Sequence, residues 1–163
     1  MAIIGVRIDG RLVHGQVANL WTNKLTVGRI LVVDDEVAQN KIQKSGLRLA
    51  TPAGVNLSVL PIDKAADHIL AGKYDKQRLF IVAKKPKTLL ALVEKGVPIK
   101  EINVGNMTQD DETRQVTRSI NVKDEDVEAF RSLDKKGVKL TSQMVPSDDP
   151  ESFMPLLEKE EKK

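Results

Sequence analysis

Short apolar runs alternate along the chain with stretches in which apolar residues recur at helical spacing. Apolar runs of about four to eight residues rich in β-branched side chains are typical of buried strands, whereas amphipathic stretches predict helices. Strands are expected over 3–8, 29–34, 55–60, 78–83, 99–104 and 138–144. Helices are expected over 13–23, 36–49, 64–71, 86–95, 124–136 and 152–158. Asp63 is a candidate N-cap, and the charged end 158–163 is expected to fray.

Repeated alternation of strand and helix with short connections predicts an α/β fold. The expected architecture is a doubly wound, mostly parallel sheet with helices on both faces. A chain of 163 residues suits one domain over 1–163. Ligands of such sheets bind beyond the carboxyl ends of the strands. The segments expected to meet there are 7–14, Asp34-Asp35 and 103–106, with Lys84-Lys85-Pro86 at the rim.

Composition removes several classes of function. Only 3% of the residues are aromatic, and the net charge of +3 comes from interspersed basic and acidic side chains, so nucleic-acid binding is not expected. The chain has no cysteine, which excludes disulfides and thiol chemistry. No apolar run approaches the roughly 20 residues of a membrane helix or resembles a signal segment. A cytoplasmic protein is therefore expected, reaching a membrane only through partners.

The segment 7–17 holds the strongest candidate chemistry. It places Arg7, Arg11 and His14 at a predicted strand-to-helix junction, where the free N–H groups of a helix N-terminus favour an anion. Arginines add donors whose geometry matches phosphate oxygens. A neutral histidine there can accept a phosphoryl group on a ring nitrogen. The same residues would also suit a solvated histidine with salt-bridged arginines, so both interpretations stay open.

The remaining residues of the loop fit a phosphate site. Gly10 and Gly15 would let the backbone approach the phosphate without a Cβ in the way. Asp9 would hold an arginine or accept a ring N–H and so fix the histidine tautomer. The phosphate-binding set expected from the segment is therefore Arg7, Asp9, Gly10, Arg11 and Gly15 around the nucleophile His14.

Other sites have weaker support. His68 lies mid-helix without a clustered partner and is expected to be structural. Asp34, Asp35 and Glu36 would suit Mg²⁺, as in some phosphotransferases of this architecture, but acids after a strand more often cap the next helix or lie in its first turn. No metal site is expected, and the glycine-rich nucleotide loops and the GxSxG elbow are absent from the sequence. The candidate rim residues are Asp34, Asp35, Asn103, Gly105 and Asn106.

The segment 7–17 resembles the active-site loop of the IIB components of the mannose/fructose/sorbose family of the sugar phosphotransferase system. The resemblance continues through further segments, at 30–38, 96–100, 103–107, 126–130 and 137–140. It spans nearly the whole chain, and its spaced motifs are jointly specific. It implies the same α/β fold and the length of an isolated IIB domain.

The resemblance also implies a reaction. A phosphorylated IIA domain would donate its phosphoryl group to His14, on Nδ1, and phospho-His14 would pass it to a sugar carried inward by membrane IIC and IID partners. The protein would then be a protein-phosphohistidine–sugar phosphotransferase without a cofactor. Arg7 and Arg11 match the phosphate-contacting arginines of the family, and Asp9 its loop acid. The sugar is not identified by the sequence, and homodimerisation is left open.

The sequence departs from the family pattern at three positions. Gly10 stands where a second acid or polar residue is commoner, Asp34 replaces a commoner serine, and Asn106 stands where glycine or serine is usual. We expect a looser loop at Gly10 and effects on rate or sugar specificity at the others.

Two other functions are alternatives. One is a phosphatase with a histidine nucleophile, although such enzymes commonly have Arg directly before His-Gly and this chain has Val13. The other is a non-catalytic module that binds an anion or a nucleotide.

Overall fold

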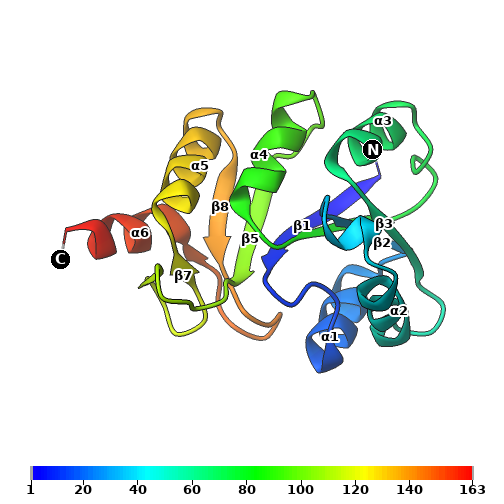
Figure 1. Ribbon diagram of the computed structural model, residues 1–163, viewed down its shortest axis with the longest axis horizontal. Helices are drawn as coiled ribbons and strands as arrows, with labels where there is room; N and C mark the ends of the chain where they lie inside the picture. The colour runs from blue at the N-terminus through cyan, green and yellow to red at the C-terminus, as the bar shows by residue number, and fades with distance from the viewer. Residues whose placement is uncertain (1, 163) are drawn as a thin grey trace.

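The computed structural model describes residues 2–162, with residues 16 and 17 described by their backbone alone (Figure 1). Its main sheet has seven strands in the order β3-β2-β4-β1-β5-β8-β9. These strands are β1 (Ile3–Asp9), β2 (Arg29–Val33), β3 (Asn56–Leu60), β4 (Leu79–Ala83), β5 (Glu101–Asn106), β8 (Lys139–Ser142) and β9 (Glu151–Ser152). Neighbouring strands are parallel except β8 and β9, which are antiparallel. The predicted doubly wound, mostly parallel sheet is confirmed.

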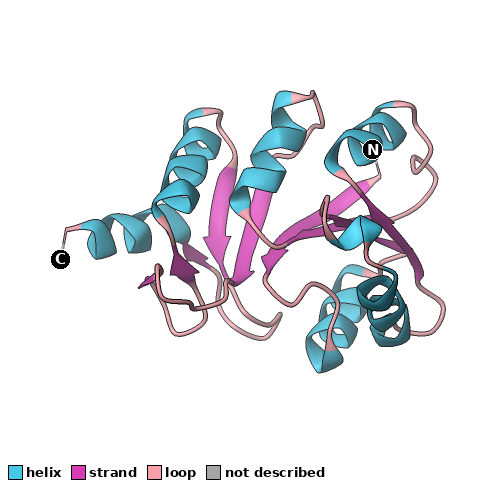
Figure 2. Cartoon of the chain, in the orientation of Figure 1, coloured by secondary structure: helices cyan, strands magenta, loops and turns pink. Residues whose placement is uncertain are grey.

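Helices cover both faces of the sheet, as predicted. They are α1 (Gly15–Leu25), α2 (Lys41–Ala50), α3 (Ile62–Leu70), α4 (Pro86–Glu94), α5 (Asp124–Lys135) and α6 (Phe153–Glu161). Helices α1 and α2 lie on one face, and α3, α4 and α5 lie on the other (Figure 2). A separate apolar cluster fills each side, with Trp21 and Leu47 on the α1 face and Leu89 and Phe130 on the α4 face. None of the described helices is long and apolar enough to cross a membrane.

Strand alternation decides which residues of β1 face α1. Val6 and Ile8 belong to the apolar cluster on the α4 face. Because successive side chains of a strand point to opposite faces, Arg7 and Asp9 point toward the α1 face. The parallel pairing of β1 with β5 places Asn103 beside Arg7 in register. The fold thus brings together two of the polar segments that the sequence predicted to meet.

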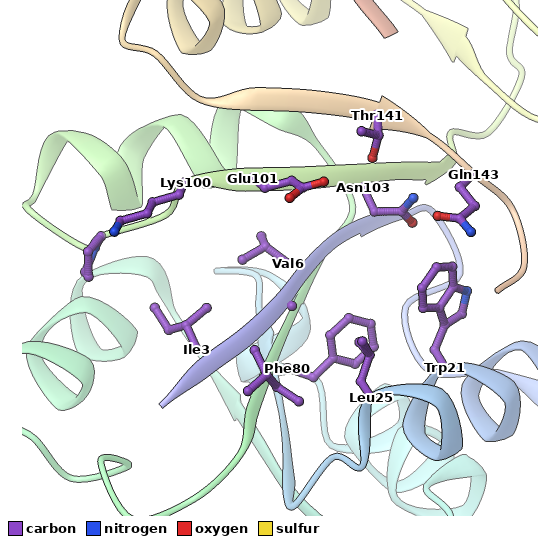
Figure 3. Close-up of a pocket in the computed structure, with 13 residues that line it drawn as sticks. Ile3, Val6, Trp21, Leu25, Phe80, Lys100, Glu101, Asn103, Thr141 and Gln143 are labelled. Carbon is purple, nitrogen blue, oxygen red and sulfur yellow. The ribbon is translucent and has the colours of Figure 1, made fainter. Parts of the chain in front are cut away.

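The face that carries α1 is only partly covered. Beyond α1, no helix among the described residues lies over this face of β5 and β8 (Figure 1). A cavity of about 440 Å³ opens there, with Asn103, Gln143 and Trp21 at one end and Lys100 at the other (Figure 3). Polar residues of β5 and β8 therefore border a space beside α1, whereas Ile102, Val104 and Leu140 of the same strands join the apolar cluster on the opposite face.

The segment predicted as one helix over 36–49 is divided, so that prediction is wrong in its first part. The Asp34 carboxylate accepts hydrogen bonds from two following backbone N–H groups at 3.0 and 2.9 Å and starts the short 3₁₀ helix η1 (Val37–Gln39). The side chain of Asn40 then accepts the N–H of Gln43 and caps α2. Asx side chains bind nearby backbone groups and interrupt helical hydrogen bonding, which amphipathic spacing does not reveal.

The prediction that Asp63 caps α3 is also wrong. Pro61 occupies the N-cap position, and its side chain makes no capping hydrogen bond. The N–H of Ile62 is instead accepted by Asp35 at 2.8 Å, from the loop after β2. Asp63 lies in the first turn of α3, where its charge still suits the helix dipole. A capping group from elsewhere in the chain thus replaces the local one.

A small antiparallel hairpin follows β5 and was not expected from the sequence. Its strands are β6 (Arg114–Gln115) and β7 (Asn121–Val122). Strands of two residues are too short to show a hydrophobic period, and the same is true of β9. The hairpin lies beside α6 and supplies a cation to the end of that helix.

The expected fraying of 158–163 stays a prediction, and Lys163 lies outside the described residues. Helix α6 continues to Glu161. Arg114 contacts the carboxylates of Glu160 at 3.3 Å and Glu161 at 2.5 Å, and also reaches Asp124 at 2.6 Å. These hydrogen bonds raise the pKa of Arg114 above its usual range. Opposite charges from a distant segment therefore hold the charged last turn.

Replacing Arg114 with alanine should loosen this last turn without unfolding the core. Exposed ion pairs are worth about 0.5–1 kcal/mol, so backbone N–H groups of the last turn should exchange with solvent roughly twofold to fivefold faster. Hydrogen exchange measured residue by residue would check this. The same measurement in high salt is the control, because screening should raise exchange in the parent chain toward that of Arg114→Ala. Equal exchange in the two proteins at low salt would contradict the prediction.

Candidate functional site

The loop between β1 and α1 has a fixed shape. The backbone turns where the N–H of Leu12 donates to the carbonyl of Asp9 at 3.0 Å. Leu12 has φ of 60°, a left-handed conformation that costs a residue with a side chain about 1–2 kcal/mol. Leu12 and Val13 are buried in the apolar cluster on the α1 face, and their burial offsets this strain. The loop is thereby anchored from inside, while Arg11 is exposed and His14 partly exposed.

His14 stands at the N-terminus of α1. It is the N-cap residue, so the helix begins at Gly15 and not at 13 as predicted. Its side chain is 25% exposed, and Nε2 lies 3.3 and 3.4 Å from the two carboxylate oxygens of Asp9. A carboxylate only accepts hydrogen bonds, so we assign the ring proton to Nε2. This leaves the lone pair of the neutral ring on Nδ1.

Asp9 is the centre of the loop. It is 1% exposed, and its carboxylate accepts hydrogen bonds from Arg7 Nε at 3.2 Å and from the backbone N–H of Arg11 at 3.0 Å. Together with the contact to His14, these bonds fix the carboxylate from several directions. The sequence predicted that Asp9 would hold an arginine or orient the ring, and in the structure it contacts both.

Arg7 is buried and its donors are engaged. Nη1 donates to the side-chain oxygen of Asn103 and, at 2.9 Å, to the carbonyl of Gln143, while Nη2 donates to the carbonyl of Met144 at 2.8 Å. With the bond from Nε to Asp9, four of the five guanidinium N–H groups have protein acceptors. Burial lowers the pKa of Arg7, and the charge of Asp9 opposes this shift. The geometry does not favour the phosphate contact expected of Arg7.

Arg11 has the opposite environment. Its side chain is exposed, and among the described residues none accepts a hydrogen bond from its guanidinium. Arg11 lies three residues before His14, and its backbone N–H donates to the carboxylate of Asp9. Arg11 is therefore the loop arginine whose N–H groups are available to an anion beside the ring.

The two glycines of the loop differ in role. Gly15 has φ of 43° and no atom within 4 Å of the position that a Cβ would take, so the space predicted there is present. A Cβ at Gly10 would press on Thr108, and the backbone N–H of Gly10 donates to the carbonyl of Asn106 at 2.9 Å. Glycine at position 10, where the family more often has an acid or polar residue, therefore allows close packing against the segment after β5. The looser loop expected there is not observed.

The acidic rim residues serve the backbone. The carboxylate of Asp34 caps η1, and that of Asp35 accepts the N–H that opens α3. Within residues 2–162, no group of three or more His, Cys, Asp or Glu side chains is arranged to hold a metal ion. The carboxylates of Asp34 and Asp35 thus support the loops around the strand ends.

The other rim residues lie on either side of the loop. Asn103 binds Arg7, and the carbonyl of Gly105 accepts the hydroxyl of Ser119 at 2.9 Å. Lys84 and Lys85, at the end of β4, border a cavity of about 210 Å³ together with Gly10. They are near the loop, but no hydrogen bond joins them to its residues in the part of the chain that the structure describes.

Sequence reasoning missed the contributions of Trp21, Gln143 and Met144. The indole Nε1 of Trp21 donates to the carbonyl of Met144 at 3.0 Å, and the Trp21 ring lies 5.0 Å from the guanidinium carbon of Arg7. The only signal was that Trp21 is the single tryptophan of the chain, on the apolar face of a predicted helix. Gln143 and Met144 act through main-chain carbonyls, which any residue would supply.

Comparison with known proteins supports the predicted resemblance. The family model of the sorbose-subfamily IIB component of the PTS matches residues 3–163. The fructose-specific EIIB component of Bacillus subtilis is 36% identical over 157 residues, which are 96% of each chain. The sorbose-specific EIIB component of Klebsiella pneumoniae is 34% identical and covers 91% of this chain and 90% of its own.

A fused relative and a solved structure complete the comparison. The mannose-specific EIIAB component of Escherichia coli strain K12 is 37% identical over 98% of this chain, which corresponds to 50% of that protein. The crystal structure of the IIBSor domain of the sorbose permease from Klebsiella pneumoniae superposes with a TM-score of 0.94 at 32% identity, over 98% of each chain. The prediction from the sequence is confirmed, and the chain belongs to the sorbose-subfamily IIB components of the sugar phosphotransferase system.

Proposed function

We propose that His14 accepts a phosphoryl group from a phosphorylated IIA domain and passes it to a sugar presented by membrane IIC and IID partners. The observation that carries this proposal is the contact of His14 Nε2 with the buried carboxylate of Asp9, which leaves Nδ1 as the nucleophilic nitrogen. The ring is partly exposed, so a partner protein has access to it. No cofactor or metal ion is needed for either step.

The two transfers balance in atoms and charge. In the first, the Nδ1 lone pair forms a bond to phosphorus while the nitrogen–phosphorus bond of the donor histidine breaks and its electrons return to that ring. In the second, a sugar hydroxyl oxygen bonds to phosphorus and its proton passes to solvent, while the Nδ1–phosphorus bond breaks and its electrons return to the ring of His14. Asp9 keeps the Nε2 proton in place in both steps, so the same ring nitrogen reacts each time.

The phosphoryl group needs donors for its equatorial oxygens. The exposed Arg11 and the first-turn N–H groups of α1 are the donors nearest to His14 along the chain, and the helix dipole adds to their attraction. Arg7 is left out of this set because its guanidinium is buried and bonded elsewhere. Transfer thus depends on one free arginine and the helix N-terminus.

The relatives support the proposed partners and setting. The mannose-specific relative is named as an EIIAB component, in which a IIA part accompanies the part that matches this chain. The names of other relatives give fructose and sorbose as their sugars. For this chain we propose a separate or fused IIA donor, a sugar acceptor and a cytoplasmic location beside the membrane, reached through IIC and IID.

Replacing His14 with alanine should abolish phosphorylation of the chain. The protein would be incubated with phosphoenolpyruvate, the general phosphotransferase components and a cognate IIA, and the label mapped by mass spectrometry. The phosphate should be labile in acid and stable in base, and its phosphorus NMR shift should be that of Nδ1-phosphohistidine. His68→Ala is the matched control, because the other histidine of the chain lies in α3 and contacts Tyr74.

Other outcomes would favour the alternatives. A label on His68, or none on the parent chain, would contradict the proposal. Hydrolysis of free phosphomonoesters without IIA would indicate a phosphatase. Tight nucleotide binding that survives His14→Ala would indicate a binding module.

Arg11→Lys should slow phosphoryl transfer by roughly tenfold, because lysine keeps the charge but cannot donate two parallel hydrogen bonds. Rapid-quench measurement of transfer from phosphorylated IIA would give the rate. Arg48→Lys is the control, since Arg48 is also exposed but lies near the end of α2. Equal rates for Arg11→Lys and Arg48→Lys would contradict the proposed role.

A further inference from the structure

We infer that Arg7 is a positioning residue, which fixes Asp9 and through it the ring of His14, and that it does not contact the phosphoryl group. The inference rests on the proposed function only in taking His14 as the reacting residue. It differs from the role that the family resemblance implied for Arg7.

The first support is the direction of the Arg7 donors. Nε points to Asp9 at 3.2 Å, while the two terminal nitrogens point to the main chain of Gln143 and Met144 and to the side chain of Asn103. The residue is 2% exposed. To reach a phosphoryl group at Nδ1 of His14, the guanidinium would have to leave these acceptors unpaired.

The second support is the space that the fold reserves for the guanidinium. The pairing of β1 with β5 shifts between Ile8 and Asp9, so that Gly105 is an extra residue on β5. A Cβ at Gly105 would overlap the guanidinium of Arg7. Only glycine therefore leaves room for Arg7 at this position, which the sequence had assigned to the rim of the site.

The third support is the side chain of Asn103. Its oxygen accepts from Arg7, but its buried amide nitrogen Nδ2 has no hydrogen-bond partner among the described residues. An unpaired buried donor destabilises the folded state, because it loses its hydrogen bonds to water without gaining others. Asn103 thus supplies an acceptor to Arg7 at a cost in stability.

The fourth support is the link to the segment after β8. The carbonyl of Met144 accepts from both Arg7 and Trp21, and the Trp21 ring stacks on the guanidinium. Asn103, Gln143 and Trp21 gather at one end of the large cavity (Figure 3). Arg7 therefore connects the carboxylate of Asp9, which contacts His14, to β5, to α1 and to the segment after β8.

The charge of Arg7 explains why an arginine is suited to this position. Asp9 contacts His14, so its negative charge would repel the incoming phosphoryl group. The buried pair of Arg7 and Asp9 is neutral overall. Asp9 can then orient the ring without a net negative charge beside the phosphate.

Arg7→Lys tests the inference, because lysine keeps the charge but cannot make four directed hydrogen bonds. Nitrogen-15 shifts of His14 would report which ring nitrogen carries the proton. The parent should show mainly Nε2–H, and Arg7→Lys a mixture of tautomers. The kcat for transfer from phosphorylated IIA should fall by about 10- to 100-fold with little change in KM, as for a misplaced reacting group.

The matched control is Arg29→Lys. Arg29 also donates to side chains, Gln77 and Ser58, and also stacks on a ring, that of Tyr74 at 5.4 Å, but it lies at the start of β2. It should leave tautomer and kcat unchanged. A parent-like tautomer ratio in Arg7→Lys, together with faster hydrolysis of phospho-His14, would overturn the inference and restore Arg7 as a phosphate ligand.

Asn103→Ala is the second variant and decides the question if Arg7→Lys does not fold. It removes one acceptor of Arg7 together with the unpaired Nδ2, so it should shift the tautomer ratio in the same direction by a smaller amount. An unchanged ratio in folded Asn103→Ala would then overturn the inference. Absence of phosphorylation in the parent chain would refute the proposed function alone, because the tautomer measurement needs no phosphodonor.

Gly105→Ala should destabilise the fold, because its methyl group displaces the buried guanidinium. Overpacking of this kind should lower the urea concentration at the midpoint of unfolding, and the tautomer mixture of Arg7→Lys should appear in this variant as well. Gly46→Ala is the control, because Gly46 lies in α2 with nothing within 4 Å and alanine favours a helix. Urea unfolding and the His14 shifts would check both. A Gly105→Ala protein as stable as Gly46→Ala would contradict the prediction.

Discussion

The buried pair of Arg7 and Asp9 is the interaction on which the rest of the site depends. Removing two charges from water costs several kcal/mol per ion, and only good geometry and further hydrogen bonds repay it. Here the guanidinium is satisfied by Asp9, Asn103 and two main-chain carbonyls. The carboxylate is satisfied by Arg7, the Arg11 backbone and the ring of His14. Because both partners are fixed by these hydrogen bonds, the pair gives the histidine ring a rigid support.

That rigidity extends into the loop. A turn at Leu12 and burial of Leu12 and Val13 fix the path of the backbone between strand and helix. The chain then places His14 at the N-terminus of α1, with the imidazole oriented by Asp9. Phosphoryl transfer needs few groups beyond position and nearby donors, so a small loop suffices if its geometry is fixed. The division of labour between the two arginines follows from burial, since one is enclosed and the other exposed.

The asymmetry of the sheet explains where such a polar network can exist. On the α4 face, β1, β5 and β8 carry apolar residues into a continuous core. On the α1 face, the same strands carry Arg7, Asn103 and Thr141 in one row, beside a cavity that no described helix fills. A second helix over that row would have required apolar side chains there. The partly covered face thus lets charged and amide groups lie side by side within a small domain.

The sequence by itself determined the order of strands and helices, the parallel α/β fold and the loop that holds the site. These follow from hydrophobic periodicity and local residue types, which act over a few neighbouring positions. Local patterns did not predict helix boundaries where side chains accept hydrogen bonds from backbone N–H groups. Asp34 and Asn40 divided an amphipathic segment, and Asp35 capped α3 in place of Asp63.

The role of Arg7 was decided only by the tertiary structure. As a residue type, a loop arginine suits a phosphate as well as a carboxylate, and the sequence does not separate the two. Its main-chain acceptors lie 136 and 137 residues away along the chain. Every residue has a main-chain carbonyl, so the sequence does not show which carbonyls accept these hydrogen bonds. Folding brings those carbonyls, Asn103 and the space at Gly105 around the guanidinium, and burial then makes its hydrogen bonds obligatory.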